Sequence, residues 1–248
     1  MKATIERECC SEQHTEVTPS EATVQFRSSR PTPKALRVVP VSPGVVESLI
    51  VTEHYLHSMP AAARLCLGVY WNDVLVGAVV FTSGPRHGYR LLSACKPQDV
   101  AVLARLWLSD DLPKNSESRV IGYCLRWIRK HRPWKLILSY ADPKVGHCGT
   151  IYQSTGWEYL GRTAPGSIIA LTDGKEIHSR TCGDRYGSGS IGHLRRTGIP
   201  VVRLPEPPKH RYVFILDKSW RWRLRAKPQP YPKLAPDYEQ GPENNYAA

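Results

Sequence analysis

Residues 139–161, SYADPKVGHCGTIYQSTGWEYLG, constrain the fold of this chain more than any other stretch. The apolar run that enters Ser139–Asp142 predicts the end of a strand, and the proline and glycine that follow predict a loop. A short helix is expected from Gly149–Thr150 to a terminating Gly156, followed by a second strand over Trp157–Gly161. This order of elements is typical of an open α/β sheet, in which ligands bind at the carboxyl ends of the strands.

Four side chains crowd around this predicted junction between strand and helix: Asp142, His147, Tyr140 and Tyr152. A carboxylate and an imidazole at the end of a strand can move protons, so the junction is a candidate catalytic site. The alternative is that these residues only shape a turn and pack aromatic rings against the core.

The charge of the chain favours a polyanionic partner. Its 34 lysines and arginines exceed its 22 aspartates and glutamates by 34 − 22 = 12. Such an excess indicates nucleic acid first and an anionic membrane surface second, and it says nothing about the fold. No apolar run is long enough to cross a membrane and there is no signal-peptide core, so no membrane association is predicted.

The cysteines argue against a structural zinc site. Seven are scattered along the chain and no two form a CxxC pair, so no metal is predicted. A reduced, intracellular protein with a cytoplasmic location is expected.

The chain divides into four predicted segments. Residues 1–33 are polar and are expected to be disordered. Residues 34–165 are expected to form the catalytic domain and residues 166–217 a basic, β-rich extension. Residues 218–248 begin with alternating basic and aromatic side chains and are expected to end in a disordered, proline-rich tail from Ala226.

Regular elements of the domain follow from hydrophobic periodicity and turn residues. They are a strand over Arg37–Val41, a short helix or turn over Val45–Ile50, hairpin strands over Leu65–Tyr70 and Val74–Phe81, a buried strand over Asp99–Leu108, a helix opening at Ser116, and a strand over Leu136–Tyr140. Between the hairpin's first strand and the short helix lie His54 and His57, which a helical turn would place on one face. Two histidines could line a polar pocket, pack, or bind a metal.

A second candidate site lies between the buried strand and the long helix. The loop Ser109–Ser116 carries Lys114 and Asn115 and leads into a helix N-terminus, whose amides and dipole suit a phosphate. An ordinary capped helix is the alternative. The apolar stripe of this helix is one face at helical period: Val120, Ile121, Cys124, Leu125 and Ile128.

The order of these elements resembles the acetyltransferase-like fold known as GNAT, an α/β fold with a mixed central sheet flanked by helices. Three stretches are similar to the Mom family of phage DNA-modification proteins: LARLWLSDDLPKNSESRVIGYCLRWI, LSYADPKVGHCGTIYQSTGWEYLG and EHYLHSMP. The resemblance covers about residues 36–217, since PPKHRYVFILD is similar to that family's C-terminal strand. It implies a transferase that converts adenine in phage DNA to an N6-carbamoylmethyl form and so protects the DNA from host restriction.

The resemblance also implies an activated donor, either acyl-coenzyme A or another carrier such as an aminoacyl group. GNAT enzymes hold the donor pyrophosphate on a glycine-rich loop, Q/R-x-x-G-x-G/A, whereas the matching stretch here, Leu112–Ser118, has no glycine. The residues expected to contact the donor are Arg105, Leu106, Leu108, Lys114, Asn115, Ser116, Glu117 and Ser118.

Most of the positive charge lies in the C-terminal part. From Lys175 to Lys227 there are 13 lysines and arginines against 4 acids, a local net charge of 13 − 4 = +9. We expect a hairpin of Ser167–Leu171 with Glu176–His178 and a glycine-rich loop over Ser179–Gly192. A short helix capped by Ser190 and ended by Gly198, a proline spacer over Pro205–Pro208 and a last strand over Tyr212–Leu216 are expected to follow. Contacts to double-stranded DNA are expected from Arg180, Arg185, Arg195, Arg196, Lys209, His210, Arg211, Trp220, Arg221 and Arg223. The alternatives are a solvated basic tail or a strand whose tryptophans pack on the domain.

Chemistry on the amino group of a paired adenine requires the base to leave the stack. Asp142 is the first candidate for general base or amino-group contact, with His54 and His147 as alternatives. Tyr55, Tyr140 and Tyr152 could donate a hydrogen bond to the donor carbonyl or stack on the base. Two rival functions stay open: a GNAT-type N-acyltransferase acting on a protein or small amine, and a non-catalytic DNA-binding protein on a GNAT scaffold.

Overall fold

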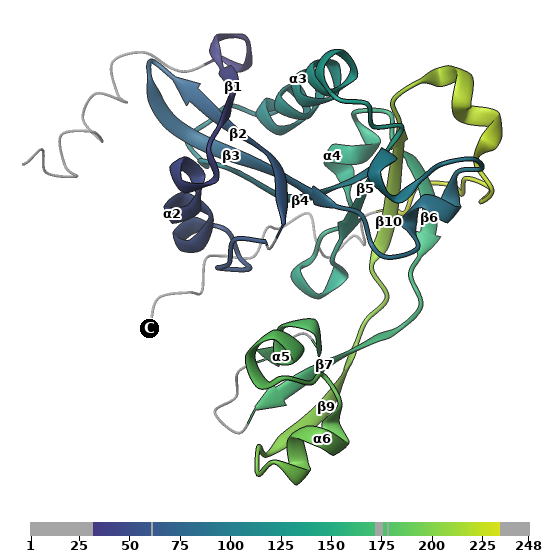
Figure 1. The fold of residues 1–248 in the computed structure, drawn as a ribbon. Coiled ribbons are helices and arrows are strands. Elements are labelled where there is room, and N and C mark those ends of the chain that lie inside the picture. Colours follow the sequence, from purple (N-terminus) through teal and green to yellow (C-terminus); the bar gives the residue numbers. More distant parts are fainter. Residues whose placement is uncertain (1–31, 61, 172–175, 178, 234–248) are drawn as a thin grey trace, which may run out of the picture.

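The computed structural model describes residues 32–60, 62–171, 176–177 and 179–233 (Figure 1). The predicted disorder of residues 1–33 and of the end of the tail therefore lies almost wholly outside the described residues. No helix in the described ranges is long and apolar enough to cross a membrane.

A seven-stranded mixed sheet forms the centre of the molecule, with the strand order β1-β2-β3-β4-β5-β10-β6. The bounds are Arg37–Val41 for β1, Ala63–Trp71 for β2, Val74–Ser83 for β3, Val100–Leu108 for β4, Leu136–Ala141 for β5, Glu158–Arg162 for β6 and His210–Ile215 for β10. Strands β4 and β5 are parallel, and the other described pairs of this sheet are antiparallel. The predicted α/β class and the predicted strand order along residues 34–165 are confirmed.

Helices cover both faces of this sheet. On one face α3, Ser116–His131, buries the whole predicted apolar stripe against the sheet, and the short helix α4, Thr150–Gln153, lies beside it. On the other face α2, Pro43–Glu53, buries Val46 and Ile50 against Cys66, Ala78 and Val80 of the hairpin. The stripe predicts α3 correctly. Apolar residues repeated at the helical period form one face of a helix, and this face is stable when it is packed against the sheet.

Backbone geometry explains three residues of the hairpin of β2 and β3. Asn72 and Asp73 have φ values of 46° and 63°, the left-handed backbone that a two-residue hairpin turn requires. At Gly77 an added Cβ would lie 2.3 Å from a methyl carbon of Leu108, so glycine permits the close approach of β4.

Strands β4 and β5 pair along only the first part of their length. Their register joins Val100–Val102 to Leu136–Leu138. Beyond this point β4 and β5 no longer pair with each other, although β4 stays paired with β3 and β5 with β10. At the point of separation the Ser139 hydroxyl donates to the Leu103 carbonyl oxygen at 3.0 Å and lies 2.8 Å from the Tyr152 hydroxyl. Side chains thus replace the backbone ladder, and the carboxyl ends of two parallel strands open towards one site.

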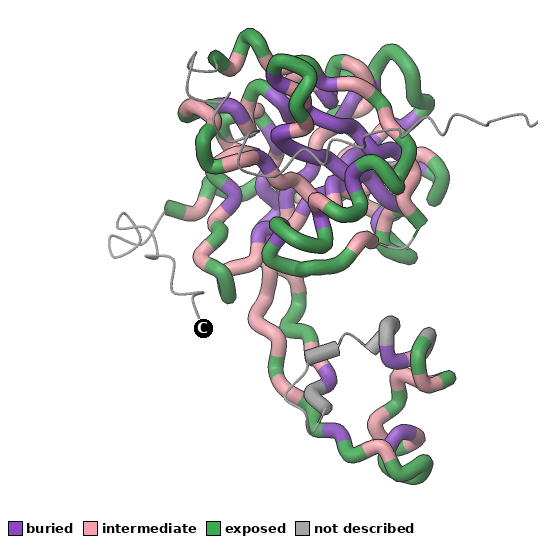
Figure 2. The backbone as a smooth tube through the Cα atoms, turned by 90° about the vertical axis from the view of Figure 1, so that its left-hand side faces the viewer, coloured by how far each residue is buried: buried purple, intermediate pink, exposed green. Residues whose placement is uncertain are grey.

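Residues 166–206 form a separate arm that hangs from the main sheet (Figures 1 and 2). Its three-stranded sheet has the order β8-β7-β9, with bounds Glu176–Ile177, Gly166–Leu171 and Val201–Glu206. Helices α5, Ser179–Tyr186, and α6, Ile191–Arg196, cover it around a small core of Ile169, Cys182, Leu194 and Val201. Two strands, β7 and β9, join the arm to the main body.

Three predictions for the C-terminal part are corrected. The stretch Ser179–Gly192 is not all loop, because burial of Cys182 in the arm core stabilises α5 despite the glycines. Strand β9 was not predicted, and it continues through Pro205, which was expected to lie in a spacer. Strand β10 leaves the predicted extension and pairs between β5 and β6, so the arm is an insertion within the main sheet.

The segment after β10 returns across the main body. A 3-10 helix, η5, Lys218–Arg223, is followed by a bridge between Leu92 and Leu224. Residues 226–233, which were expected to be disordered, lie against the domain. The Gln229 amide donates to the Tyr159 carbonyl oxygen at 2.8 Å, and the Tyr231 hydroxyl donates to the Trp157 carbonyl oxygen at 2.6 Å.

Candidate active site

His54 lies at the end of α2 and is buried next to the gap between β4 and β5. The Leu56 amide donates to its Nδ1 at 3.1 Å, so neutral His54 carries its proton on Nε2. Burial, followed by the charges of Arg105, His147 and His57, lowers the pKa of His54 to about 4. His54 is therefore neutral near pH 7 and acts as a hydrogen-bond donor at Nε2, which makes it a poor general base.

The predicted pairing of His54 and His57 on one helical face is wrong. Helix α2 ends at Glu53, His54 has an extended backbone, and His57 has a φ of 42°. The His57 ring is exposed, with its Nδ1 3.1 Å from the Val51 carbonyl oxygen. Within the described ranges no group of three or more histidine, cysteine, aspartate or glutamate side chains could hold a metal ion.

Tyr55 connects the two predicted halves of the site. Its ring stacks on His54 with centroids 4.5 Å apart and meets the edge of His147 at 5.7 Å. Burial, then the negative charge of Asp142, raises the pKa of Tyr55. Burial lowers the pKa of His147, against the opposing pull of Asp142. These four residues thus lie close enough to influence one another's protonation.

Asp142 caps the turn that follows β5. Its Oδ1 accepts the Lys144 amide at 2.9 Å, and its Oδ2 lies 3.0 Å from the ammonium of Lys209. Lys209 also pairs with Glu206 at 2.8 Å. Lys209 lies directly before β10, where the chain returns from the arm, so tertiary structure brings it to the carboxylate that the sequence singled out.

Arg105, a predicted donor contact, bonds to the segment that follows α2. Its guanidinium donates to the Ser58 carbonyl oxygen at 3.1 Å and to the Ser58 hydroxyl at 3.3 Å. Through these hydrogen bonds to Ser58, Arg105 holds the segment that carries His54 and Tyr55 against β4. Burial lowers the pKa of Arg105, and Tyr55 counteracts this.

The two remaining candidate tyrosines lie on opposite sides of β5. Tyr152 is buried, and burial raises its pKa to about 12, so its hydroxyl is a neutral hydrogen-bond donor beside Ser139. Tyr140 packs against the cluster that contains Leu138 on the other face, where burial raises its pKa and Arg211 opposes this. The structure brings Asp142, His54, Tyr55, His147 and Tyr152 together and leaves Tyr140 outside.

The predicted donor loop borders a cavity of about 570 Å³ between the start of α3 and the end of α4. Asn115 precedes the helix with a φ of 71°, and the Ser118 hydroxyl lies 2.8 Å from that of Ser154. The lining residues are Thr32, Pro33, Lys34, Asn115, Ser118, Arg119, Ser154 and Thr155. Of these, Arg119 and Thr155 carried no local signal that would have identified them.

Other predicted donor residues fill structural positions. The Ser116 hydroxyl is buried and donates to the Pro113 carbonyl oxygen at 2.6 Å. Leu108 lies in the main core and Leu106 packs against it, so both are packing residues. Lys114 is exposed and Glu117 is half-buried at the start of α3, where both can reach a ligand.

The predicted DNA contacts separate into three places. In the arm, Arg185, Arg195 and Arg196 are exposed, and the Arg180 side chain lies outside the described residues. Beside the site, Lys209 is half-buried, and Arg211 donates to the Leu160 carbonyl oxygen at 3.2 Å. His210 is buried, with its Nδ1 2.9 Å from the Tyr159 hydroxyl, so its prediction as a DNA contact is wrong.

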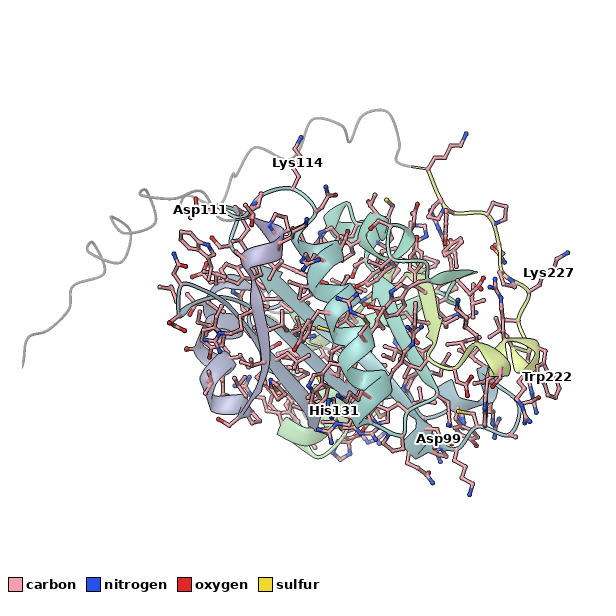
Figure 3. The ribbon with its side chains drawn as sticks, turned by 90° about the horizontal axis from the view of Figure 1, so that it is seen from above. Asp99, Asp111, Lys114, His131, Trp222 and Lys227 are labelled. Atoms are coloured by element: carbon pink, nitrogen blue, oxygen red, sulfur yellow. The ribbon has the colours of Figure 1, made fainter. Side chains whose placement is uncertain are left out.

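The third place is the η5 surface, defined by Lys218–Arg223. Trp220 packs under Lys135 and Arg223, and Arg221 pairs with Glu158. Trp222, which was not among the predicted DNA contacts, is 77% exposed and stacks on Arg223 at 4.6 Å. Figure 3 shows Trp222 on the opposite side of the molecule from Lys114.

These features define a mixed α/β protein with a carboxylate, histidines and tyrosines gathered where two parallel strands separate, next to a basic arm. The chain belongs to the Mom protein family, whose family model matches residues 35–233. The resemblance predicted from the sequence is thereby confirmed. The chain is 32% identical over 208 residues to the methylcarbamoylase Mom of Escherichia phage Mu, which covers 81% of this chain and 85% of the phage protein.

Solved structures with a similar arrangement are acetyltransferases. A spermidine N-acetyltransferase from Vibrio cholerae matches with a TM-score of 0.45 and 9% identity, covering 76% of this chain and 98% of that one. An N-acetyltransferase from Staphylococcus aureus matches with a TM-score of 0.40 and 10% identity, covering 73% of this chain and 97% of that one. These values describe a partial likeness in fold.

Proposed function

We propose that this chain is a DNA-modifying transferase that places a carbamoylmethyl-type group on the N6 amino group of adenine. The observation that carries the proposal is the position of Asp142, which lies where the carboxyl end of β5 meets the strand returning from the basic arm. The phage Mu relative is named a methylcarbamoylase, which supports the transfer of such a group.

In this mechanism the target adenine is flipped out of the duplex, because its amino group is otherwise engaged in base pairing. The N6 lone pair forms a bond to the donor carbon, and the bond between that carbon and its carrier breaks. A proton of the amino group passes to Asp142. General-base catalysis of this kind contributes about 10²–10⁴-fold to the rate.

The surrounding side chains have distinct roles. Tyr55 exposes part of its ring beside Asp142, where a flipped base can stack on it. The Tyr152 hydroxyl, with a pKa of about 12, is neutral near pH 7 and would donate to the donor carbonyl in place of its hydrogen bond to Ser139. His147, an exposed residue, is the second candidate to accept the proton.

The donor would lie along the start of α3. The cavity of about 570 Å³ there is lined by two cationic side chains, Lys34 and Arg119, among others. A helix N-terminus and cations suit a phosphate-bearing carrier, of which acyl-coenzyme A is one. The Ser139 and Tyr152 hydroxyls meet in the gap between β4 and β5, and the transferred group would lie next to that gap.

The arm would hold the duplex by its backbone. Arg185, Arg195 and Arg196 expose their side chains on α5 and α6, and phosphate contacts of this kind supply sequence-independent affinity. Because the arm joins the main body next to Asp142, a duplex on the arm would present its target base at the site.

Nucleoside mass spectrometry of cellular DNA tests this function. We expect cells that produce the wild-type protein to contain an adenine nucleoside carrying the added group. The Asp142→Asn variant keeps an acceptor for the Lys144 amide but cannot take a proton, so the modified fraction should fall by about 10²-fold or more. Asp73→Asn is a matched control, because Asp73 is exposed and pairs with Arg37 in the hairpin turn.

The same experiment separates the rival functions. Unmodified adenine with wild-type protein, together with acylation of a protein or small amine, would favour an N-acyltransferase. Unmodified adenine with retained DNA binding would favour a non-catalytic scaffold.

A further inference from the structure

Both carboxylate oxygens of Asp142 have a partner in the structure, and one partner is the Lys209 ammonium, which must leave before that oxygen can accept a proton. Its Oδ1 accepts the Lys144 amide at 2.9 Å, and its Oδ2 lies 3.0 Å from the Lys209 ammonium. The hydrogen bond from the Lys144 amide fixes the orientation of the carboxylate and leaves one lone pair of Oδ1 free. The ammonium, in contrast, occupies the other carboxylate oxygen, Oδ2.

Lys209 is built into the neck of the arm, which we define as residues 163–166 and 206–209. Its amide donates to the Thr163 hydroxyl at 3.0 Å, and its carbonyl oxygen accepts the Thr163 amide at 2.9 Å. Glu206, which pairs with Gly166 across the two strands, holds the same ammonium at 2.8 Å. One side chain therefore ties the neck of the arm to the carboxylate of the site.

The ion pair between Lys209 and Asp142 is suited to exchange. The Lys209 side chain is 32% exposed, so an external anion can reach it, whereas Asp142 is only 13% exposed. An ion pair at a partly exposed site shifts an equilibrium by about fivefold or less. A phosphate oxygen can replace a carboxylate oxygen with a similar charge-assisted hydrogen bond. Glu206 keeps the ammonium at the neck during such an exchange.

We propose that DNA lying along the neck of the arm draws the Lys209 ammonium from Asp142 to a backbone phosphate, so that the carboxylate is free to accept a proton only when DNA is bound. This inference rests on the proposed function for its consequence, since the freed carboxylate is the proposed base. The exchange itself is a property of DNA binding. It would keep the site inactive towards other amines when the arm is empty.

Measured DNA affinity tests the exchange without requiring catalysis. The probe is a fluorescently labelled duplex, with anisotropy recorded over a series of salt concentrations. Lys209→Met should weaken binding and reduce the slope of log affinity against log salt by about one, because one phosphate contact is lost. Thermal unfolding of each variant confirms that it is folded.

A double-mutant cycle with Asp142→Asn tests the competition. If Asp142 holds Lys209 in the free protein, Asp142→Asn releases it and should tighten DNA binding by up to about fivefold. In the Lys209→Met background the same substitution should tighten binding less, because only the general effect of removing a negative charge is left. Arg196→Met is the matched control, since it removes an exposed arm cation that has no contact with Asp142.

Two results would overturn the proposal. One is a Lys209→Met variant with the wild-type affinity and salt slope. The other is an Asp142→Asn effect that is equal with and without Lys209. Failure of the proposed function would show separately, as unmodified adenine in the wild type, while the binding cycle would still report the exchange.

Discussion

Replacing Ser139 with alanine probes the hydrogen bonds that fill the gap between β4 and β5. The Ser139 hydroxyl serves the Leu103 carbonyl oxygen at 3.0 Å and the Tyr152 hydroxyl at 2.8 Å, and all three residues are buried. A buried polar group left without its partner costs about 1–3 kcal/mol. Since alanine leaves two such groups, we expect Ser139→Ala to lower the free energy of unfolding by about 2–4 kcal/mol.

A second substitution separates the contribution of the Tyr152 hydrogen bond from that of the Leu103 hydrogen bond. Tyr152→Phe removes the tyrosine hydroxyl but leaves the bond from Ser139 to Leu103, so it should cost only about 1 kcal/mol. In the double variant the phenylalanine has no hydroxyl to leave unpaired. The combined loss should therefore be smaller than the sum of the single losses by about 1–2 kcal/mol.

Urea unfolding followed by tryptophan fluorescence measures all four proteins. The pH must stay well below 12, so that Tyr152 remains neutral in every sample that contains it. The modified adenine fraction in cells should fall in both single variants, because the gap positions Tyr152 beside Tyr55. Losses that add to within about 0.5 kcal/mol would refute the shared hydrogen-bond network.

Three further predictions follow from single residues. His54 has a pKa of about 4 against an ordinary value of 6.5, so the unfolded chain binds a proton below pH 6.5 that the folded protein does not. Stability should fall as the pH drops from 6.5 towards 4, by up to about 2 kcal/mol at pH 5 relative to a His54→Asn variant in urea unfolding. Gly149→Ala should cost about 2–5 kcal/mol, because the new Cβ would lie 2.3 Å from the Tyr212 ring at a φ of +85°. Gly156→Ala, at a φ of +75° with no atom within 4 Å, should cost only about 1–2 kcal/mol, and equal losses would contradict the role of the clash. Trp222→Ala should change unfolding by less than about 0.5 kcal/mol but weaken binding of a single-stranded oligonucleotide by about fivefold or more, and unchanged anisotropy would exclude the η5 surface as a nucleic-acid contact.

The sequence by itself determined the elements of the main domain and the likeness to the Mom family. The apolar stripe of α3, the hairpin turn at Asn72–Asp73 and the glycines around α4 are local patterns, and each is present as expected. Local patterns are reliable here because helix period, turn backbone and positive φ depend on neighbours within a few residues. Asp142 was identified for the same reason, since it directly follows a strand.

Only the tertiary structure decided how the site is assembled. The insertion of β10 between β5 and β6 brings Lys209 to Asp142, and the packing of Cys182 in the arm stabilises a helix where glycines favoured a loop. Tyr152 lines the gap, whereas Tyr140 packs on the opposite face of the sheet. Trp222 is exposed, whereas Trp220 packs against the domain. These outcomes depend on contacts between residues far apart in the chain, for which periodicity and turn chemistry carry no signal.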